Sequence, residues 1–156
     1  MMEFHRIGDH GLREPVATAR PASTLNDGRR DFDLIGGRSK VVSREREKSG
    51  HWSNLEFDYE GWTLMDGLAN IDRMFGTGDG KYFEGVSVRT FDPVAREWTI
   101  YWTEVDHPVL KEQVRGRFDG NVGTFYRADK NARFVWRHET ADKAHWELDR
   151  LLPDNQ

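Results

Sequence analysis

The stretch YFEGVSVRTFDPVAREWTIYW, residues 82–102, decides the fold of this chain. Two segments in it, residues 84–91 and 98–103, are rich in β-branched and aromatic residues, which favour strands. Between them, Asp92-Pro93 is typical of the start of a type I turn, because proline fixes φ at the second turn position. The stretch therefore predicts an antiparallel β-hairpin, and hairpins repeated along a chain build a barrel or a sandwich.

The composition fits one domain whose core is built largely from rings. The chain has 156 residues, including six Trp, nine Phe and four Tyr but no Cys. Each buried aromatic side chain removes about 150–250 Å² from water, so a few of them supply much of the core. The lack of cysteine fits a reducing compartment, and we expect a cytoplasmic protein.

The charge and hydropathy patterns argue against two classes of partner. The 27 acidic and 23 basic residues are mixed along the chain and give a net charge of -4. This mixture leaves no broad basic face to attract phosphate backbones, so we predict no nucleic-acid partner. No run approaches the ~20 apolar residues of a membrane helix, and the first residues lack the apolar core of a secretory signal. We therefore also predict no membrane partner.

The N-terminal part divides into an arm and the start of the domain. Residues 1–28 show no sustained period and are predicted to form an irregular arm, partly disordered or draped on the surface, while residues 29–156 form the domain. Within the domain, residues 54–59 alternate between apolar and polar, the pattern of a strand with one buried face. Gly61 then predicts a bulge, after which Trp62 continues with changed facing.

Two further hairpins complete the strand pattern. Asp119-Gly120 lies between alternating segments and predicts a type I′ turn. The last hairpin is predicted around residues 141–143, with Thr140 opposite Ala144 and Glu139 opposite His145. In this register one face carries Phe134, Trp136, His138, Trp146 and Leu148. The total is eight or nine strands with no amphipathic helix of any length, which predicts an all-β, antiparallel barrel or sandwich.

Several segments together resemble a known family. They are FDLIGGR at the start of the domain, then DGLANID, the hairpin of residues 82–102, GRFDGNVGTFY and RFVWRHETADKAHWE. The combination is similar to a family of uncharacterised bacterial proteins with a lipocalin-like (calycin) barrel, over residues 31–148. The resemblance implies a closed or nearly closed up-and-down β-barrel with an internal cavity for a small apolar or amphipathic ligand, and it implies no known reaction.

The chain departs from the family pattern at both ends. Lipocalin-like chains commonly open with Gly-x-Trp, whose tryptophan closes the barrel floor, but here Gly37 and Arg38 precede Ser39. The floor is therefore either looser or plugged by another ring. A final tryptophan-bearing strand is also missing. Either the barrel closes with fewer strands, or an edge stays open and a second subunit covers it in a homodimer.

The candidate ligand-binding residues are aromatic and polar side chains of the predicted barrel wall. Alternation places Trp98, Ile100 and Trp102 on one face and Tyr101 on the other, and only one set faces inward. Each ring either lines a cavity or fills the core. Polar residues facing inward need a partner, and a buried arginine is suited to hold a ligand carboxylate. The predicted ligand-binding set is Arg89, Trp102, Tyr101, Trp62, Trp136, Asn70, Asp72 and His138; its polar members face outward in the alternative interpretation.

No metal site and no cofactor are predicted. A histidine on a barrel wall, such as His138, can ligate haem iron. However, no pair of histidines has the spacing of a zinc site, and no third ligand is evident. His138 is therefore interpreted as a partly buried polar residue of the wall, and His145 as the partner of an acid on the surface.

Three functions remain open from the sequence. The first is binding of a small apolar or amphipathic molecule in the barrel, with an anionic group held by Arg89. The second is a cofactor-independent lyase, cyclase or isomerase that uses the same cavity, with an acid or base drawn from Glu56, Glu60, Asp72 and His138. The third is a dimeric interaction module with a packed core. No nucleophile motif is present to favour the second.

Overall fold

The chain forms one curled antiparallel sheet. The computed structural model describes residues 25–46, 50–78, 80–140 and 143–150. In these residues the elements are η1 (Asp33–Ile35), β1 (Gly37–Arg46), β2 (Trp52–Leu64), η2 (Met65–Gly67), β3 (Ala69–Gly78), β4 (Lys81–Asp92), β5 (Glu97–Glu104), β6 (His107–Asp119), β7 (Val122–Tyr126), β8 (Ala132–Thr140) and β9 (Lys143–Arg150). Each strand pairs with the next one in sequence. The predicted all-β, up-and-down architecture is confirmed.

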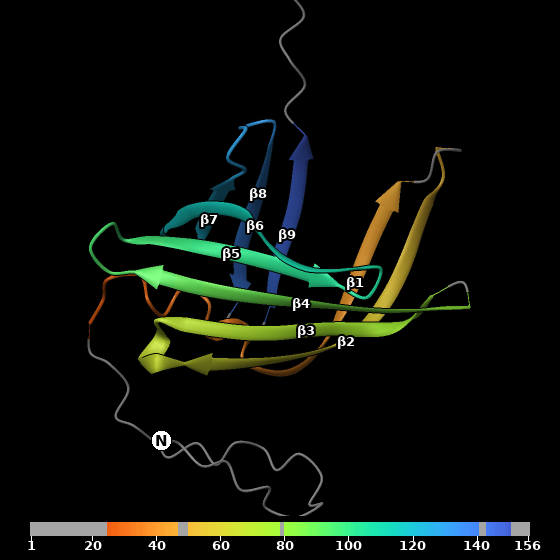
Figure 1. The fold of residues 1–156 in the computed structure, drawn as a ribbon, viewed down its shortest axis with the longest axis horizontal. Helices are drawn as coiled ribbons and strands as arrows, with labels where there is room; N and C mark the ends of the chain where they lie inside the picture. Colours follow the sequence, from red (N-terminus) through yellow and green to blue (C-terminus); the bar gives the residue numbers. More distant parts are fainter. Residues whose placement is uncertain (1–24, 47–49, 79, 141–142, 151–156) are drawn as a thin grey trace, which may run out of the picture.

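The sheet is a half-barrel with two free edges in the described part of the chain. Its strand order runs from β1 to β9 without a pairing between these two strands. Figure 1 shows the sheet curling so that β8 and β9 lie behind β4 and β5. The closed or nearly closed barrel implied by the family resemblance is therefore replaced by an open edge. Of the two alternatives, the structure has the open edge, and the second subunit expected to cover it stays a prediction.

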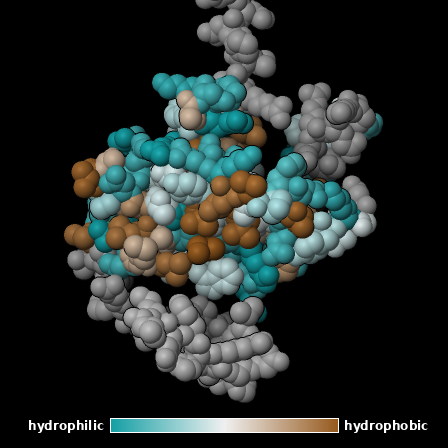
Figure 2. Space-filling view, viewed as in Figure 1, coloured by the Kyte–Doolittle hydropathy of each residue, from teal (hydrophilic) through white to brown (hydrophobic). Residues whose placement is uncertain are grey.

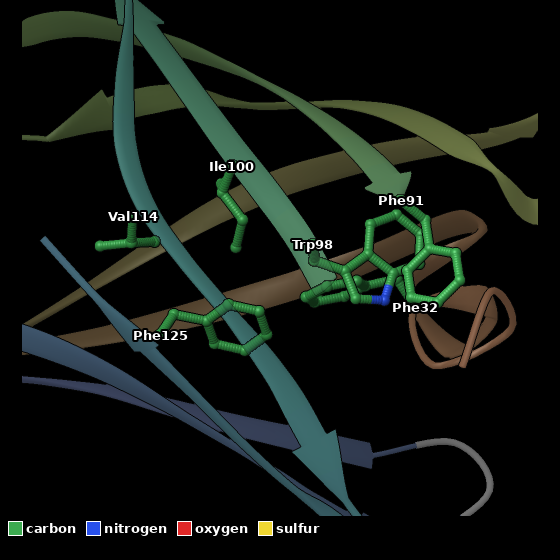
Figure 3. Close-up of a cluster of buried hydrophobic side chains, with 6 residues drawn as sticks. All are labelled: Phe32, Phe91, Trp98, Ile100, Val114 and Phe125. Carbon is green, nitrogen blue, oxygen red and sulfur yellow. The ribbon is translucent and has the colours of Figure 1, made fainter. Parts of the chain in front are cut away.

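Phe32 plugs one end of the half-barrel. It lies just before η1 and is 1% exposed. Its ring meets Trp98, Phe118 and Trp136 edge-on, with centroids 5.0, 5.2 and 5.5 Å apart. Figure 3 shows Phe32 beside Trp98 and Phe91, in the same buried cluster as Phe125. The place of the missing floor tryptophan is thus taken by another ring, which was one of the two alternatives.

The hairpin of β4 and β5 is the predicted one. The two strands pair from Gly85 opposite Glu104 to Asp92 opposite Glu97. The Asp92 carboxylate accepts hydrogen bonds from the backbone N–H groups of Val94 and Ala95, at 2.8 and 3.0 Å. Such a side chain bonded to its own turn stabilises the turn locally.

The other two predicted hairpins have shifted registers. Asp119 pairs with Val122, so the turn is Gly120-Asn121 rather than Asp119-Gly120. Gly120 has a φ of 58°, whereas Asn121 does not have a positive φ. A type I′ turn needs positive φ at both positions, so the prediction of that type is wrong.

The final hairpin brings Trp136 opposite Trp146 and Arg137 opposite His145. The predicted register is wrong by two residues, because a bulge between His138 and Thr140 takes Glu139 out of the pairing. Since the error is an even number, the predicted sharing of one face by Trp136 and Trp146 still holds. The two rings stack with centroids 6.2 Å apart.

Gly61 allows the plug to approach the sheet and does not mark a bulge. The pairing of β2 runs without a shift through Gly61, which lies opposite Gly37 on one side and Asp72 on the other. A methyl group at Gly61 would lie 2.2 Å from the carbonyl oxygen of Ile35 in η1. Glycine is needed here because another backbone passes directly over it.

Replacing Gly61 with alanine is expected to push η1 and the neighbouring Phe32 away from the sheet. Crowding of this kind costs about 1–3 kcal/mol of unfolding free energy. Urea unfolding followed by tryptophan fluorescence measures the change, and Asn54→Ala, on an exposed position of the same strand, is the control. Equal unfolding midpoints for the two variants would contradict this account of Gly61.

Candidate functional site

The inner face of the half-barrel is the face that carries the Phe32 plug. Trp98 and Ile100 of β5 point to this face and are 0% and 8% exposed. Because side chains alternate along a strand, Trp102 shares this face and Tyr101 does not. On β4 the same face carries Gly85, Ser87 and Arg89, which lie opposite Glu104, Trp102 and Ile100.

Arg89, Asn70 and Asp72 form a buried polar network on the inner face. Arg89 is directly opposite Asn70 in the β3–β4 pairing, and Asp72 is two residues further along β3. Arg89 Nη1 donates to Asn70 Oδ1 at 3.0 Å and to Asp72 Oδ2. All three residues are less than 5% exposed. Three of the four polar candidates from the sequence, Arg89, Asn70 and Asp72, are therefore brought together, and they face the interior.

Rings surround the charged end of Arg89. Its guanidinium carbon lies 4.9 Å from the Phe32 ring centroid and 5.7 Å from the Trp136 ring centroid. Such cation–π contacts gain strength when water is excluded. Asp72 supplies one negative charge against the single positive charge of Arg89, so this ion pair has no net charge. The carboxylate that Arg89 was predicted to take from a ligand is supplied by the chain itself.

Two buried polar atoms lie next to this pair, Arg89 Nε and Tyr59 Oη. Arg89 Nε lacks a hydrogen-bond partner among the described residues, whereas Tyr59 Oη interacts with the side chains of both Asp72 and Arg89. Tyr59 is 8% exposed and lies on β2 diagonally across from Asp72, since Gly61 is the direct partner of Asp72. Burial raises the pKa of Tyr59 well above its ordinary value; Arg89 lowers it and Asp72 raises it. The hydroxyl is therefore protonated at neutral pH.

Trp102 and two phenylalanines form an aromatic wall further along the inner face. The wall consists of Phe57, Phe83 and Trp102, with ring centroids 5.2 Å apart for the first pair and 6.4 Å for the second. A methyl group at Gly85 would lie 2.1 Å from the Trp102 ring, so the indole packs directly on that glycine. Unlike Trp98, Trp102 and Phe83 are only half-buried. The wall is thus partly accessible to solvent, whereas the cluster around Phe32 and Trp98 is not.

Trp62 and Tyr101 lie on the opposite, outer face of the sheet. Trp62 is opposite Ile71, Ile71 is opposite Val88, and Val88 is opposite Tyr101. Figure 2 shows hydrophobic surface over β3 to β5 on this side of the molecule. The structure therefore separates these two candidates from Arg89. The prediction for Trp62 relied on a change of facing at Gly61, and the uninterrupted register keeps Trp62 on the face of Glu60.

His138 lines a pocket of about 400 Å³ with Leu34, Asn121, Glu139 and Thr140. Its ring lies 4.8 Å from that of Phe118, and burial lowers its pKa. Arg89, Asn70 and Asp72 do not line this pocket. The predicted set of eight residues therefore divides into the inner network with Trp102 and Trp136, the outer pair, and His138.

The acids considered for a catalytic role have other partners. Glu60 is bonded to Arg73 at 2.9 Å on the outer face, and Glu56 is an exposed neighbour of Lys40. Asp72 is bonded to Arg89. In the described ranges, no group of three or more His, Asp or Glu side chains is arranged to hold a metal ion. The only helices there are two three-residue 3-10 helices, neither long enough to cross a membrane.

No protein-family model matches this chain, and no curated protein sequence matches it.

A second pocket, of about 460 Å³, lies at the turn that follows β4. It is lined by Asn26, Asp27, Gly28, Asp31, Arg96, Arg117, Phe118 and Gly120. Burial, followed by the charge of Asp27, raises the pKa of Asp31 to about 6. In contrast, the hydrogen bond from Arg29 lowers the pKa of Asp27 to about 2. Asp31 is the group of this pocket that changes charge near neutral pH.

Asp31 predicts a pH dependence of stability. Because its folded-state pKa is raised, the stability it contributes is complete below about pH 4 and is lost as the pH rises through 6. Asp31→Asn removes this loss and is expected to be more stable than wild type at pH 7 but not at pH 4. A shift of two units corresponds to about 3 kcal/mol, which we reduce to about 1 kcal/mol because Asp31 is half-exposed. Urea unfolding at both pH values measures the difference in stability. If the variant and wild type have equal free energies of unfolding at both pH values, the raised pKa of Asp31 is contradicted.

Removing one member of the Arg89–Asp72 pair is expected to lower the free energy of unfolding far more than removing both. Asp72→Ala leaves a buried cation without its counter-charge, which costs about 3–5 kcal/mol. In the double variant Arg89→Met with Asp72→Leu both charges are gone, and most of the stability returns. Denaturant unfolding measures both proteins. If the double variant is no more stable than Asp72→Ala, the pair is not electrostatically coupled as described.

Proposed function

We propose that this protein binds a small amphipathic molecule on the inner face of the half-barrel. The observation that carries the proposal is the half-buried aromatic wall beside a fully buried polar network. Small-molecule sites are typically lined by apolar and aromatic side chains with a few polar groups that fix orientation. Here the wall supplies the apolar part, and Arg89, Asn70, Asp72 and Tyr59 supply the polar part.

The open edge of the sheet supports access to this face. On the strands at the C-terminal end, Trp146 and Leu148 share the face of Trp136 but remain 39% and 46% exposed. Inward-facing rings near the floor, such as Trp98 and Phe125, are fully buried instead. The inner face thus has fully buried rings on its central strands and exposed rings at its β9 edge, where apolar surface is available to a ligand.

The network and the wall are close enough to engage one ligand. Ser87 is directly opposite Trp102 and next but one to Arg89 along β4. Diagonal neighbours on one face of a sheet are about 7–8 Å apart, which is within the length of a small molecule. A ligand whose apolar body lies on Trp102 can therefore reach toward Arg89 with its polar end.

No observation favours catalysis over binding on this face. A general acid or base needs a free position beside the substrate. Asp72 is bonded to Arg89, and burial raises the pKa of Tyr59 above its ordinary value, which already lies well above neutral pH, so the hydroxyl is not available as a base there. Binding without a reaction is the function that this arrangement supports best.

Neighbouring residues on opposite faces provide a matched test. Trp102→Leu removes a ring from the inner face, and Tyr101→Leu removes one from the outer face of the same strand. We expect N-phenyl-1-naphthylamine, a neutral apolar fluorophore, to bind wild type and Tyr101→Leu alike and to bind Trp102→Leu about tenfold more weakly. A tenfold change corresponds to about 1.4 kcal/mol, less than the burial of a large ring is worth.

The titration is read by fluorophore emission, with circular dichroism to confirm that all three proteins are folded. Equal affinity of Trp102→Leu and wild type would remove the inner face from the site. A loss of affinity in Tyr101→Leu instead would assign the binding to the outer row of Trp62, Ile71, Val88 and Tyr101.

A further inference from the structure

We propose that β9 pairs in antiparallel fashion with β9 of a second copy of this chain, so that two half-barrels join through these edges into a two-fold dimer. The inference concerns the edge of the sheet and does not depend on the ligand proposed for the inner face. It follows from the free edge of β9, from the order of charges along that strand and from the different order along β1.

β9 leaves one side of its backbone unpaired among the described residues. It pairs with β8 from Arg150 opposite Ala132 to Lys143 opposite Thr140, and no described strand lies on its other side. Figure 1 shows β9 and β1 as the two ends of the curled sheet. A free edge presents a row of N–H and C=O groups that another strand can pair with. When that strand is a second β9, a two-fold axis relates the two copies.

The outer face of β9 is complementary in charge to itself. Alternation places Lys143, His145, Glu147 and Asp149 on this face, because Trp146 lies on the inner one. With Trp146 at the centre of the pairing, Lys143 lies opposite Asp149 of the second copy. In the same register His145 lies opposite Glu147 of the second copy. The two-fold axis repeats each contact, so four pairs of basic and acidic side chains meet across the interface.

The inner face of β9 fits the same register. Trp146 lies opposite Trp146 of the second copy, and Leu148 lies opposite the small side chain of Ala144. Trp146 contacts Phe134 and Trp136 of β8, with ring centroids 5.6 and 6.2 Å apart, yet it remains 39% exposed. Aromatic pairs directly opposite each other stabilise antiparallel strands. The added strand lies beside Trp146 in the sheet, so the surface that the ring turns toward the interior stays available to a ligand.

The charged side chains of β9 can take a second partner. Asp149 is bonded to Arg133 at 2.9 Å and Lys143 to Glu139 at 2.5 Å, and all four side chains are exposed. A carboxylate has two acceptor oxygens and an ammonium group has three donors, so neither is saturated by one contact. Exposed ion pairs add little affinity. In this dimer they select the register, while backbone bonds and the tryptophan rings hold the strands together.

The other free edge, β1, has an order of charges that opposes pairing with itself. Its outer face carries Arg38, Lys40 and Arg44 and no acid among the described side chains. A second β1 would place Lys40 opposite Arg44 with Val42 at the centre, or Arg38 opposite Arg44 with Val41 at the centre. Like charges directly opposite each other are destabilising, and charged edges keep sheets apart. Of the two edges, only β9 therefore suits a second copy.

Exchanging the end charges of β9 tests the register. Asp149→Lys brings two lysines opposite each other, and Lys143→Asp brings two aspartates opposite each other. Because each change acts at both symmetry-related contacts, we expect either variant to raise the dissociation constant of the dimer about tenfold. The double variant restores opposite charges and is expected to return it to within about threefold of wild type. Asp58→Lys, an equal charge change on the interior strand β2, is the control and should dimerise like wild type.

Sedimentation equilibrium at several protein concentrations measures the dissociation constant, and circular dichroism confirms that each variant is folded. For wild type we expect a monomer–dimer equilibrium with a constant of about 10–100 µM, because one strand pair is a small interface. Hydrogen exchange needs no variant: the alternate backbone amides of β9 that point away from β8 should become better protected as the protein concentration rises.

Three results would overturn the proposal. The first is a wild-type protein that stays monomeric at every concentration. The second is growth beyond the dimer, since pairing of β9 with β1 of another copy is head-to-tail and does not close on two copies. The third is a double variant that dimerises no better than the two single variants, which would show that these charges do not face each other.

Discussion

The buried ion pair between Arg89 and Asp72 is the interaction on which the inner face depends. Two charges removed from water are tolerated only when they compensate each other and find further hydrogen bonds. Asn70 supplies one of these bonds, and the rings of Phe32 and Trp136 supply favourable contacts to the cation. The pair therefore holds together β3, β4, β8 and the segment before η1, which are distant in sequence.

The Phe32 plug, which contacts the Arg89 guanidinium, gives the half-barrel two unlike ends. Phe32 reaches the interior because Gly61 lets the backbone of η1 pass close to β2. At that end Trp98, Phe125 and Phe32 pack without exposed surface. At the other end no plug is present among the described residues, and Trp102 remains half-buried. Unequal packing of one sheet face thus leaves apolar surface exposed beside Trp102.

The period-2 pattern predicted most of the fold and half of the site. Alternation within residues 54–59 placed Phe57 and Tyr59 correctly on the buried face, and the candidates Asn70, Asp72 and Arg89 do meet there. Alternation relates residues within one strand, however, and says nothing of which face is shared between strands. The facing of Trp62 was wrongly inferred because Gly61 was interpreted as the site of a bulge. Glycine is needed there because the backbone of Ile35, 26 residues earlier, passes directly over it.

The period-2 pattern could not predict features that depend on contacts between residues distant in sequence. Phe32 lies in an irregular segment that has no period to indicate its burial. The meeting of Tyr59, Asp72 and Arg89 depends on the pairing of three strands. The register of the last hairpin depends on a bulge at Glu139, and the turn at Gly120-Asn121 differs by one residue from the stronger Asp-Gly signal.

The most direct measurement of the central claim is the nuclear magnetic resonance signal of the Arg89 side-chain Nε–H. In the free protein we predict that this proton exchanges slowly with water, because its side chain is buried beside Asp72. In Asp72→Asn the same proton should exchange faster, because the counter-charge that holds the guanidinium is gone. Rapid exchange in the wild-type protein, or equal exchange in the two proteins, would contradict a buried ion pair on which the inner face depends.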